Sequence, residues 1–381
     1  MSDSASNDKC IGIILALCAV AAIIACNSPL EPLYNEWIQT NMLVQVGDYA
    51  LKKPLILWVN EGLMALFFLL VTLEIKREMT VGTLNTHNKR ALPFFAAIGG
   101  MLFPALIYIG LTLDQPSLFN GWAIPTATDI VFALSLLGII VKNCPQSIRS
   151  FLLALAVFDD IGAIIIIAVY YSNAISLISA SMMVLCSGLL YYFHYKKITN
   201  LAPYLLVGAI LWLCVLKSGV HATLAGIVVA LALPSDGVDS LSERVEHGLT
   251  PWVNYLILPL FAFTNAGITF IGTTTAHFFH IMPIAIVAGL VVGKQLGITA
   301  CSYLAVKLRY AALPESMKWS DIYGVSMLCG VGFTMSLFIG TLAFESNMEQ
   351  FALWIRVGVM GGSLLSALCA WLYFNIGRQA R

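Results

Sequence analysis

Two adjacent aspartates, Asp159 and Asp160, and one lysine, Lys294, stand inside long apolar segments of the chain. Asp129 and Glu61 are further carboxylates within such segments. A charged side chain at the centre of a bilayer costs about 2.5 to 3.5 kcal/mol. Carboxylates exchange protons, and their oxygens are hard ligands suited to small cations. These residues therefore indicate a site that binds a proton or a small cation inside a membrane.

The spacing of the two aspartates assigns them different surroundings. Successive residues of a helix point about 100° apart, so Asp159 and Asp160 cannot face the same neighbour. Lys294 is the natural partner for one of them, and we expect the other to line a cavity. An alternative is that these charges form internal salt bridges, or are protonated, and only hold the helices together. Two adjacent aspartates in a row as apolar as "LLALAVFDDIGAIIIIAVYY" favour the binding site over that alternative.

The composition predicts that helices in a membrane position these residues. The 381 residues are 59% hydrophobic and 10% charged, with a mean hydropathy of +0.87, whereas soluble proteins carry about 25% charged residues. The apolar run at 11–28 resembles a signal peptide, but the acidic residues before it favour a first membrane span. Apolar runs predict twelve spans, near residues 11–28, 55–76, 91–112, 121–141, 147–171, 175–195, 201–217, 219–233, 247–270, 281–306, 322–344 and 352–376.

The distribution of basic residues predicts the orientation. With twelve spans, fifteen Lys and Arg fall on the side of the two termini and four on the other side, with Lys294 inside a span. The positive-inside rule then places both termini in the cytoplasm. Basic and acidic residues balance at 20 each, which argues against a nucleic-acid partner. The nine cysteines include no CxxC pair, and no motif in the sequence indicates a cofactor.

Two of the predicted spans carry residues that interrupt helices. The fourth contains Pro125, followed by Thr128 and Asp129, and the eleventh contains Gly330 and Gly332. Proline removes a backbone donor, and the freed groups must be satisfied by protein or in a cavity, whereas the glycines also suit close packing. Each broken span is the middle of a trio, within 91–171 and 281–376, and the trios have opposite orientations. We therefore predict an all-α membrane transporter whose two inverted three-helix repeats place broken helices four and eleven across each other at mid-membrane. Asp129 and Lys294 are positioned to neutralise the helix ends that meet there.

Several segments, in order along the chain, resemble the bacterial NhaA-type Na+/H+ antiporters. They are "LEIKRE", "PTATDIVFAL", "LALAVFDDIGA", "SGVHATLAG", "EHGLTPWVNYLILPLFAFTNAG", "GKQLGI" and "GVGFTMSLFI". The resemblance covers nearly the whole chain. It implies a twelve-helix protein of the bacterial inner membrane, usually a homodimer, that exchanges external protons for cytoplasmic Na+ or Li+. It further implies electrogenic exchange, activation at alkaline pH and a role in sodium and pH homeostasis. A hairpin between the first two spans is a main dimer contact in this family, and residues 29–54 are long enough for it.

The resemblance also implies roles for particular residues. Asp159 and Asp160 match the pair that binds the transported Na+, Li+ or proton, Thr128 and Asp129 match the unwound part of helix four, and Lys294 matches the lysine of helix ten. A cytoplasmic pH-sensing cluster is matched by Glu74, Arg77, Glu78, Glu246 and His247, with His221 associated with it. From the residues alone, this cluster is more typical of a solvated helix end.

Two other functional classes are compatible with buried acids. A cation channel, or another cation-coupled transporter, also uses carboxylates and broken helices. Adjacent titratable aspartates facing a buried lysine favour exclusive occupancy by a proton or a cation, and therefore exchange. An intramembrane enzyme is the rival from another class, but the sequence lacks GxSG, HExxH and GxGD motifs. We therefore expect a transporter and not an enzyme.

Overall fold

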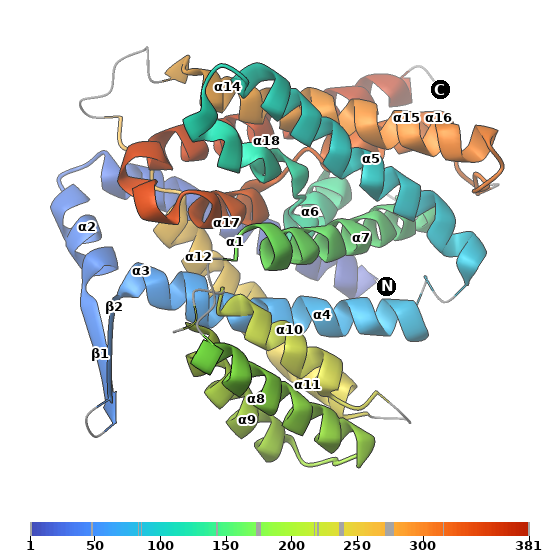
Figure 1. The fold of residues 1–381 in the computed structure, drawn as a ribbon. Coiled ribbons are helices and arrows are strands. Elements are labelled where there is room, and N and C mark those ends of the chain that lie inside the picture. Colours follow the sequence, from blue (N-terminus) through green and yellow to red (C-terminus); the bar gives the residue numbers. More distant parts are fainter. Residues whose placement is uncertain are drawn as a thin grey trace. The chain divides into compact units, whose positions relative to one another are not determined.

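The computed structural model describes residues 2–46, 49–82, 84, 86–141, 144–172, 177–216, 218, 221–235, 240–270, 278–314 and 316–379. The chain forms two compact units, which are described separately below. The first comprises Met1–Ser28, Val81–Ala163 and Asn265–Arg381, and the second comprises Pro29–Thr80 and Ile164–Thr264. Figure 1 shows the ribbon with the helices and strands labelled.

The first unit contains the residues predicted to do chemistry in the membrane. Its long helices are interrupted by short or irregular turns, and α7 continues beyond the unit's boundary (Figure 1). Its elements are α1 (Ser2–Cys26), α5 (His87–Thr112), the 3-10 helix η2 (Pro116–Thr126), α6 (Ile130–Ile140), α7 (Gln146–Tyr170), α14 (Ile281–Ala288), the π-turn η4 (Gly289–Gly293), α15 (Lys294–Lys307), α16 (Trp319–Leu328), α17 (Phe333–Ala343), the 3-10 turn η5 (Glu345–Asn347) and α18 (Met348–Gln379).

Close backbone contact between α5 and α15 fixes where Lys294 lies. A Cβ atom on Gly99 would lie 2.1 Å from the carbonyl oxygen of Gly297, and one on Gly297 would lie 2.0 Å from that of Gly99. Only glycine fits at both positions, as is common where membrane helices approach closely. The π-turn that precedes α15 packs its Gly293 against Pro104 of α5. Irregular turns of this kind often occur at functional residues, and here α15 begins at Lys294 itself.

The two predicted helix breaks are present in the first unit. The axes of η2 and α6 differ by 50°, and those of α16 and α17 by 52°. The segment that links η2 to α6 has extended backbone at Ala127 and Asp129. Pro125 cannot donate a backbone hydrogen bond, which accounts for the end of regular structure there. Each break leaves helix-end backbone groups that side chains of the site must satisfy.

The second unit combines a hairpin with a group of helices. Its elements are α2 (Glu31–Gln39), β1 (Asn41–Val46), β2 (Tyr49–Pro54), α3 (Leu55–Leu57), the π-turn η1 (Trp58–Leu63), α4 (Met64–Thr80), α8 (Leu177–Tyr195), α9 (Leu201–Leu216), α10 (Thr223–Ala232), α11 (Leu241–Trp252), the π-turn η3 (Val253–Ile257) and α12 (Leu258–Asn265). Helix α10 packs against both α4 and α9. Lys76 of α4 donates to the carbonyl of Leu233 just after the end of α10, which is a common C-terminal cap.

The antiparallel pair β1 and β2 is a small hairpin in a chain that is otherwise helical, as predicted. The strands run from the Asn41–Pro54 pair to the Val46–Tyr49 pair. Two residues, Gly47 and Asp48, separate the strands in the sequence, the spacing of two-residue hairpins. A six-residue strand carries too few apolar residues to stand out beside runs of 20, which is why only the family resemblance indicated a hairpin here.

Within the described residues, six helices are long and apolar enough to cross a membrane, or eight if each bent pair is one span. These eight correspond to the predicted spans one to five and ten to twelve. The other four predicted spans fall on α8, α9, α10 and the continuous helix of α11, η3 and α12. The predicted bounds of two of these spans were wrong. The span predicted over 219–233 is the ten-residue helix α10, and the helix predicted over 247–270 begins at Leu241 and ends at Asn265. Its start is set by Ser240, whose hydroxyl accepts from the backbone of Glu243 as an N-cap.

Candidate functional site

Lys294 lies at the centre of the candidate site and is fully buried. Its Nζ donates hydrogen bonds to the carbonyl oxygen of Thr126, to Thr128 Oγ1 at 2.9 Å and to Asp159 Oδ2 at 2.8 Å. An ammonium group has three donors, so these contacts satisfy it completely. The carbonyl of Thr126 is the C-terminal end of η2, where a positive charge is favourable. The expectation that Lys294 neutralises a helix end and pairs with an aspartate therefore agrees with this geometry.

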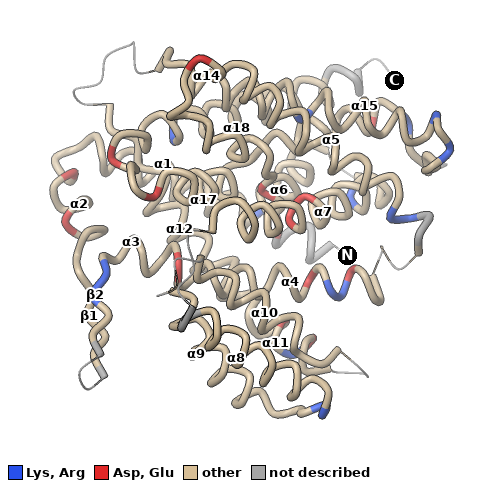
Figure 2. Tube along the Cα trace, viewed as in Figure 1, with Lys and Arg blue, Asp and Glu red and all other residues tan. Residues whose placement is uncertain are grey.

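The two aspartates differ in their surroundings, as the 100° spacing predicts. Asp159 is 1% exposed, and its Oδ2 forms the ion pair with Lys294. Its other oxygen, Oδ1, is buried and has no hydrogen-bond partner among the described residues. Asp160 is 4% exposed on the next position of α7. Figure 2 shows that acidic and basic residues are sparse along the trace of the helices. The pair thus presents an unsatisfied carboxylate oxygen beside a second buried carboxylate.

Asp129 joins the two broken helices. Its Oδ1 accepts from the backbone N–H of Phe132 at 3.0 Å and caps the N-terminus of α6. Its Oδ2 accepts from the backbone N–H of Thr334 at 3.1 Å and from the hydroxyl of Thr334, in the first turn of α17. A carboxylate is favourable at a helix N-terminus because the helix dipole is positive there. One carboxylate thus serves two helix N-termini.

The backbone of the two breaks is also joined directly. The N–H of Asp129 donates to the carbonyl of Val331 at 2.8 Å, and Thr128 Oγ1 donates to the carbonyl of Cys329 at 2.8 Å. These bonds satisfy groups that the interrupted helices leave without intrahelical partners. Broken helices four and eleven therefore cross at Thr128, Asp129 and the turn between α16 and α17. We refer to this arrangement as the crossing.

The glycines of span eleven are required by close packing at the crossing. A Cβ atom on Gly330 would lie 2.3 Å from Ser366 Oγ and 2.5 Å from the carbonyl oxygen of Leu290. A Cβ atom on Gly332 would lie 2.0 Å from Ser336 Oγ. Both glycines therefore allow the turn between α16 and α17 to pack closely against the residues around it. This agrees with the interpretation from the sequence that the glycines suit close packing.

The chemistry of the donors fits a small monovalent cation that binds and leaves. Among the described residues, no group of three or more His, Cys, Asp or Glu side chains is arranged to hold a metal ion. The oxygens available near Asp159 and Asp160 are carboxylate, hydroxyl and backbone carbonyl oxygens, which are hard ligands. Such oxygens suit a small, hard cation.

A second cluster of charges occupies the end of α4 in the second unit. Arg77 pairs with Glu246 of α11 through a hydrogen-bonded contact, and its guanidinium also lies 3.5 Å from Glu78. Both carboxylates are buried, and Glu74 lies half-buried one turn earlier on α4. Burial raises the pKa of the Glu246 carboxyl, and the positive charge of Arg77 opposes part of that increase. Four of the predicted pH-sensing residues are therefore placed together.

The two predicted histidines differ in their relation to this cluster: a charge on His247 lowers the pKa of Glu246, whereas His221 lies apart. His247 is exposed, and its Nε2 lies 3.9 Å from Oε1 of Glu243 on the outer face of α11. His221 hydrogen-bonds to the carbonyl of Tyr171 at 2.9 Å, just before the start of α10. Lys76 of α4 caps the opposite end of α10, so His221 is about 15 Å along that helix from the cluster's side. The structure therefore does not bring His221 to the cluster.

Sequence reasoning missed three partners of the site. Thr334 supplies two donors to Asp129, and the carbonyls of Thr126 and Cys329 accept from Lys294 and Thr128. Thr334 lies two residues after Gly332, at the position where a helix restarted by the break would expose its first N–H groups. A search for hydroxyl residues just after each break would have found it. Backbone carbonyls give no signal in a sequence.

Comparison with known proteins gives consistent matches over nearly the full length. The profile of the family described as Na+/H+ antiporter 1 matches residues 2–374. The Na+/H+ antiporter NhaA of Rhodospirillum rubrum is 48% identical over 382 aligned residues, covering 98% of this chain and 96% of that protein. NhaA of Pseudomonas fluorescens is 48% identical, covering 94% and 91%. NhaA 2 of Shewanella denitrificans is 46% identical, covering 97% and 94%.

Proposed function

Because the chain belongs to the Na+/H+ antiporter 1 family, we propose that it exchanges external protons for cytoplasmic Na+ or Li+ at the Asp159–Asp160 pair. The observation that carries this proposal is the buried Asp159 Oδ1, which has no partner within the described part of the chain while Oδ2 is bound to Lys294. A buried carboxylate oxygen without a partner is costly. A cation or a proton would satisfy it, and the two would compete for it.

The exchange follows from that competition. In the cation-bound state, Na+ or Li+ binds between the carboxylates of Asp159 and Asp160, with oxygens of the crossing completing the coordination. Protons arriving from the other side neutralise the carboxylates and release the cation. Because the site cannot hold protons and the cation together, movement of one across the membrane drives the other. A channel would need no such exclusive occupancy.

Lys294 supports this exchange because its ammonium group holds one oxygen of the aspartate pair in place. It holds Asp159 Oδ2 and the end of η2, so that only part of the pair is open to the ion. When a cation approaches Asp159, the positive charge of Lys294 opposes it. We propose that Lys294 lowers the affinity enough for release, and that Asp129 and Thr128 keep the crossing in register.

Electrogenic exchange is part of the proposal. Two carboxylates can each take up a proton, whereas one Na+ or Li+ carries a single charge. An exchange of more than one proton for one cation moves net charge across the membrane, so that a membrane potential can drive cation export. This supports a role in sodium and pH homeostasis.

We propose that the Arg77 cluster regulates this exchange. At low pH, protonation of Glu246 weakens its attraction to Arg77. As the pH rises, ionised Glu246 strengthens the bond to Arg77. Activation at alkaline pH would follow if the ion-paired cluster favours the active conformation. His247 lies beside Glu243, and its charge also lowers the pKa of Glu246. His221 acts at a separate position in the unit.

The remaining proposals concern the architecture. We propose twelve spans, with inverted repeats about 91–171 and 281–376 placing the crossing at mid-membrane, in a single transporter domain of the bacterial inner membrane with both termini cytoplasmic. The opposite order of the two trios and the bias of basic residues support this arrangement. A homodimer through the β1–β2 hairpin is supported by its exposed Leu43 and Val44.

The test is transport in everted vesicles that contain the protein. Addition of Na+ or Li+ should release accumulated protons, more strongly at alkaline than at neutral pH, and an imposed potential should change the rate. Asp160→Asn should lose the response, because an amide cannot exchange a proton for a cation. Asp114→Asn, which changes an exposed aspartate of the same unit, is the matched control. Exchange by Asp160→Asn equal to that of Asp114→Asn would contradict the proposal.

A further inference from the structure

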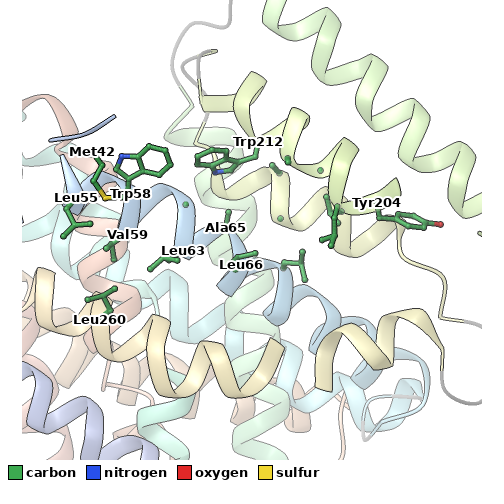
Figure 3. A pocket seen from close by; sticks show the side chains of 18 residues that line it. Met42, Leu55, Trp58, Val59, Leu63, Ala65, Leu66, Tyr204, Trp212 and Leu260 are labelled. Carbon is green, nitrogen blue, oxygen red and sulfur yellow. The ribbon is translucent and has the colours of Figure 1, made fainter. Parts of the chain in front are cut away.

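The second unit contains an apolar cavity that the proposed exchange does not use. It lies among β1, η1, α4, α9, α10 and α12, and it has a volume of about 510 Å³ (Figure 3). Ligand-binding cavities usually measure about 300 to 1,000 Å³. Carbon atoms form nearly all of its wall. A cavity of this size and chemistry holds a hydrocarbon group.

Small residues create the cavity. Gly62, Ala65, Gly208 and Gly226 line it where larger side chains would fill the space. The glycines at 208 and 226 also allow close helix contacts, since a Cβ atom on Gly226 would lie 2.0 Å from the carbonyl oxygen of Ala65. A Cβ atom on Gly62 would meet only Trp212, at 3.6 Å. The space therefore results from packing that the surrounding helices maintain.

The rim of the cavity faces outward through apolar side chains. Leu66 on α4 is 39% exposed and Leu205 on α9 is 52% exposed, and Ala209 is exposed one turn further along α9. In a chain of an integral membrane family, exposed apolar side chains of these helices contact lipid. The surrounding medium is therefore itself hydrocarbon.

Two charged residues adjoin residues of the cavity wall without lining it themselves. Met42 lines the cavity and pairs directly with Lys53 across the hairpin, so their side chains lie on the same face of the sheet. Lys53 forms an ion pair of 2.7 Å with Glu61, which precedes the cavity residue Gly62. The indole Nε1 of Trp58, another wall residue, is buried and has no hydrogen-bond partner among the described residues.

We propose that this cavity binds one acyl chain of a membrane phospholipid whose head group lies at Lys53 and Glu61. The apolar wall takes the chain, the unpaired N–H of Trp58 donates to the ester carbonyl, and Lys53 binds the phosphate. Glu61 binds the ammonium of a zwitterionic head group such as phosphatidylethanolamine. A nonionic detergent lacks this pattern of charges, and a second copy of the chain would place protein at the rim where the apolar wall suits a hydrocarbon chain. The inference does not rest on the proposed exchange activity.

The test uses purified protein in vesicles containing phosphatidylethanolamine with a photoreactive diazirine on one acyl chain. After illumination, labelled peptides are identified by mass spectrometry. We expect the peptides spanning 58–69 and 204–212 to carry at least fivefold more label than the exposed face of α1. Equal labelling of all lipid-facing helices would overturn the proposal, and so would unlabelled cavity peptides.

Matched variants separate the cavity from the general lipid surface. Ala209→Phe should fill the mouth and reduce cavity labelling severalfold, whereas Leu206→Phe, which changes an exposed residue of α9 outside the cavity, should not. Trp58→Phe should reduce labelling less than Ala209→Phe, because it removes only the N–H donor. Lys53→Gln should remove the preference for phosphatidylethanolamine over a competing lipid whose head group carries no charged group. Normal labelling in Ala209→Phe would refute the assignment. Gel filtration of each variant establishes that it is folded.

Discussion

Lys294→Met is the most direct test of how the crossing is held together. Methionine keeps most of the volume of the lysine stem and removes the ammonium group, so three acceptors lose their donor at once: Asp159 Oδ2, Thr128 Oγ1 and the carbonyl of Thr126. Lys294 is 0% exposed and Asp159 1% exposed, so water cannot replace the ammonium. Breaking a buried ion pair by removal of one partner costs about 3 to 5 kcal/mol.

Most of this cost comes from the carboxylate that is left without a partner. The double variant Lys294→Met with Asp159→Asn removes that charge, and we expect it to recover at least half of the lost stability, because a buried ion pair replaced on both sides is often nearly neutral. The matched control is Lys307→Met, which changes an exposed lysine of the same helix, where surface substitutions shift stability by only about 0.5 kcal/mol.

The assay is thermal unfolding of the purified protein in a mild detergent, combined with cation-dependent transport. We expect a melting temperature well below that of wild type for Lys294→Met, an intermediate value for the double variant, and a shifted apparent cation affinity for Lys294→Met. The reasoning is refuted if Lys294→Met melts like Lys307→Met, or if the double variant is less stable than the single one.

Three further predictions address the other residues. Asp159→Asn in purified protein should abolish Na+-driven proton movement. Retained exchange would show that Asp159 is not part of the ion-binding pair. Because the folded-state pKa of Glu246 is raised, the contribution of its protonated form to stability is fully present below the ordinary pKa of glutamate and is lost as the pH rises through the raised value. Glu246→Gln removes this titration, so it should move the pH profile of antiport, measured from about pH 6.5 to 9, whereas Glu36→Gln, which changes an exposed glutamate of α2, should leave the profile in place. Gly330→Ala should lower the melting temperature because its Cβ would strike the carbonyl of Leu290, whereas Gly110→Ala, where nothing lies within 4 Å, should not; equal melting temperatures would show that the turn can shift.

The membrane character and the charged site could be predicted because their signals are strong. Long apolar runs need no knowledge of partners, and a lysine among them is costly enough to require a partner. The angle of about 100° between successive helix residues also predicts, without a structure, that Asp159 and Asp160 have different neighbours. Which aspartate pairs with Lys294 could not be predicted, because that depends on how α7 and α15 are rotated about their axes.

Other features depended on information that a sequence lacks. The end of α10 and the start of α11 are set by caps and by Lys76, not by hydropathy. The place of His221 follows from the direction of α10 relative to α4. The apolar cavity arises where several small residues coincide in space, and each of them alone is ordinary in a membrane helix.

The contacts of Asp129 also have a consequence for how the protein is made. Asp129 caps not only α6 but also the N-terminus of α17 at Thr334, which lies 205 residues further along the chain. The hydroxyl of Thr128 and the backbone N–H of Asp129 donate to carbonyls of Cys329 and Val331, in the segment just before α17. During synthesis, the fourth span therefore enters the membrane with its break still unsupported. The break acquires its partners only after α17 has left the ribosome. Assembly of this region must wait for the last third of the polypeptide, and a chain stalled before Phe333 would hold an incomplete half of the site.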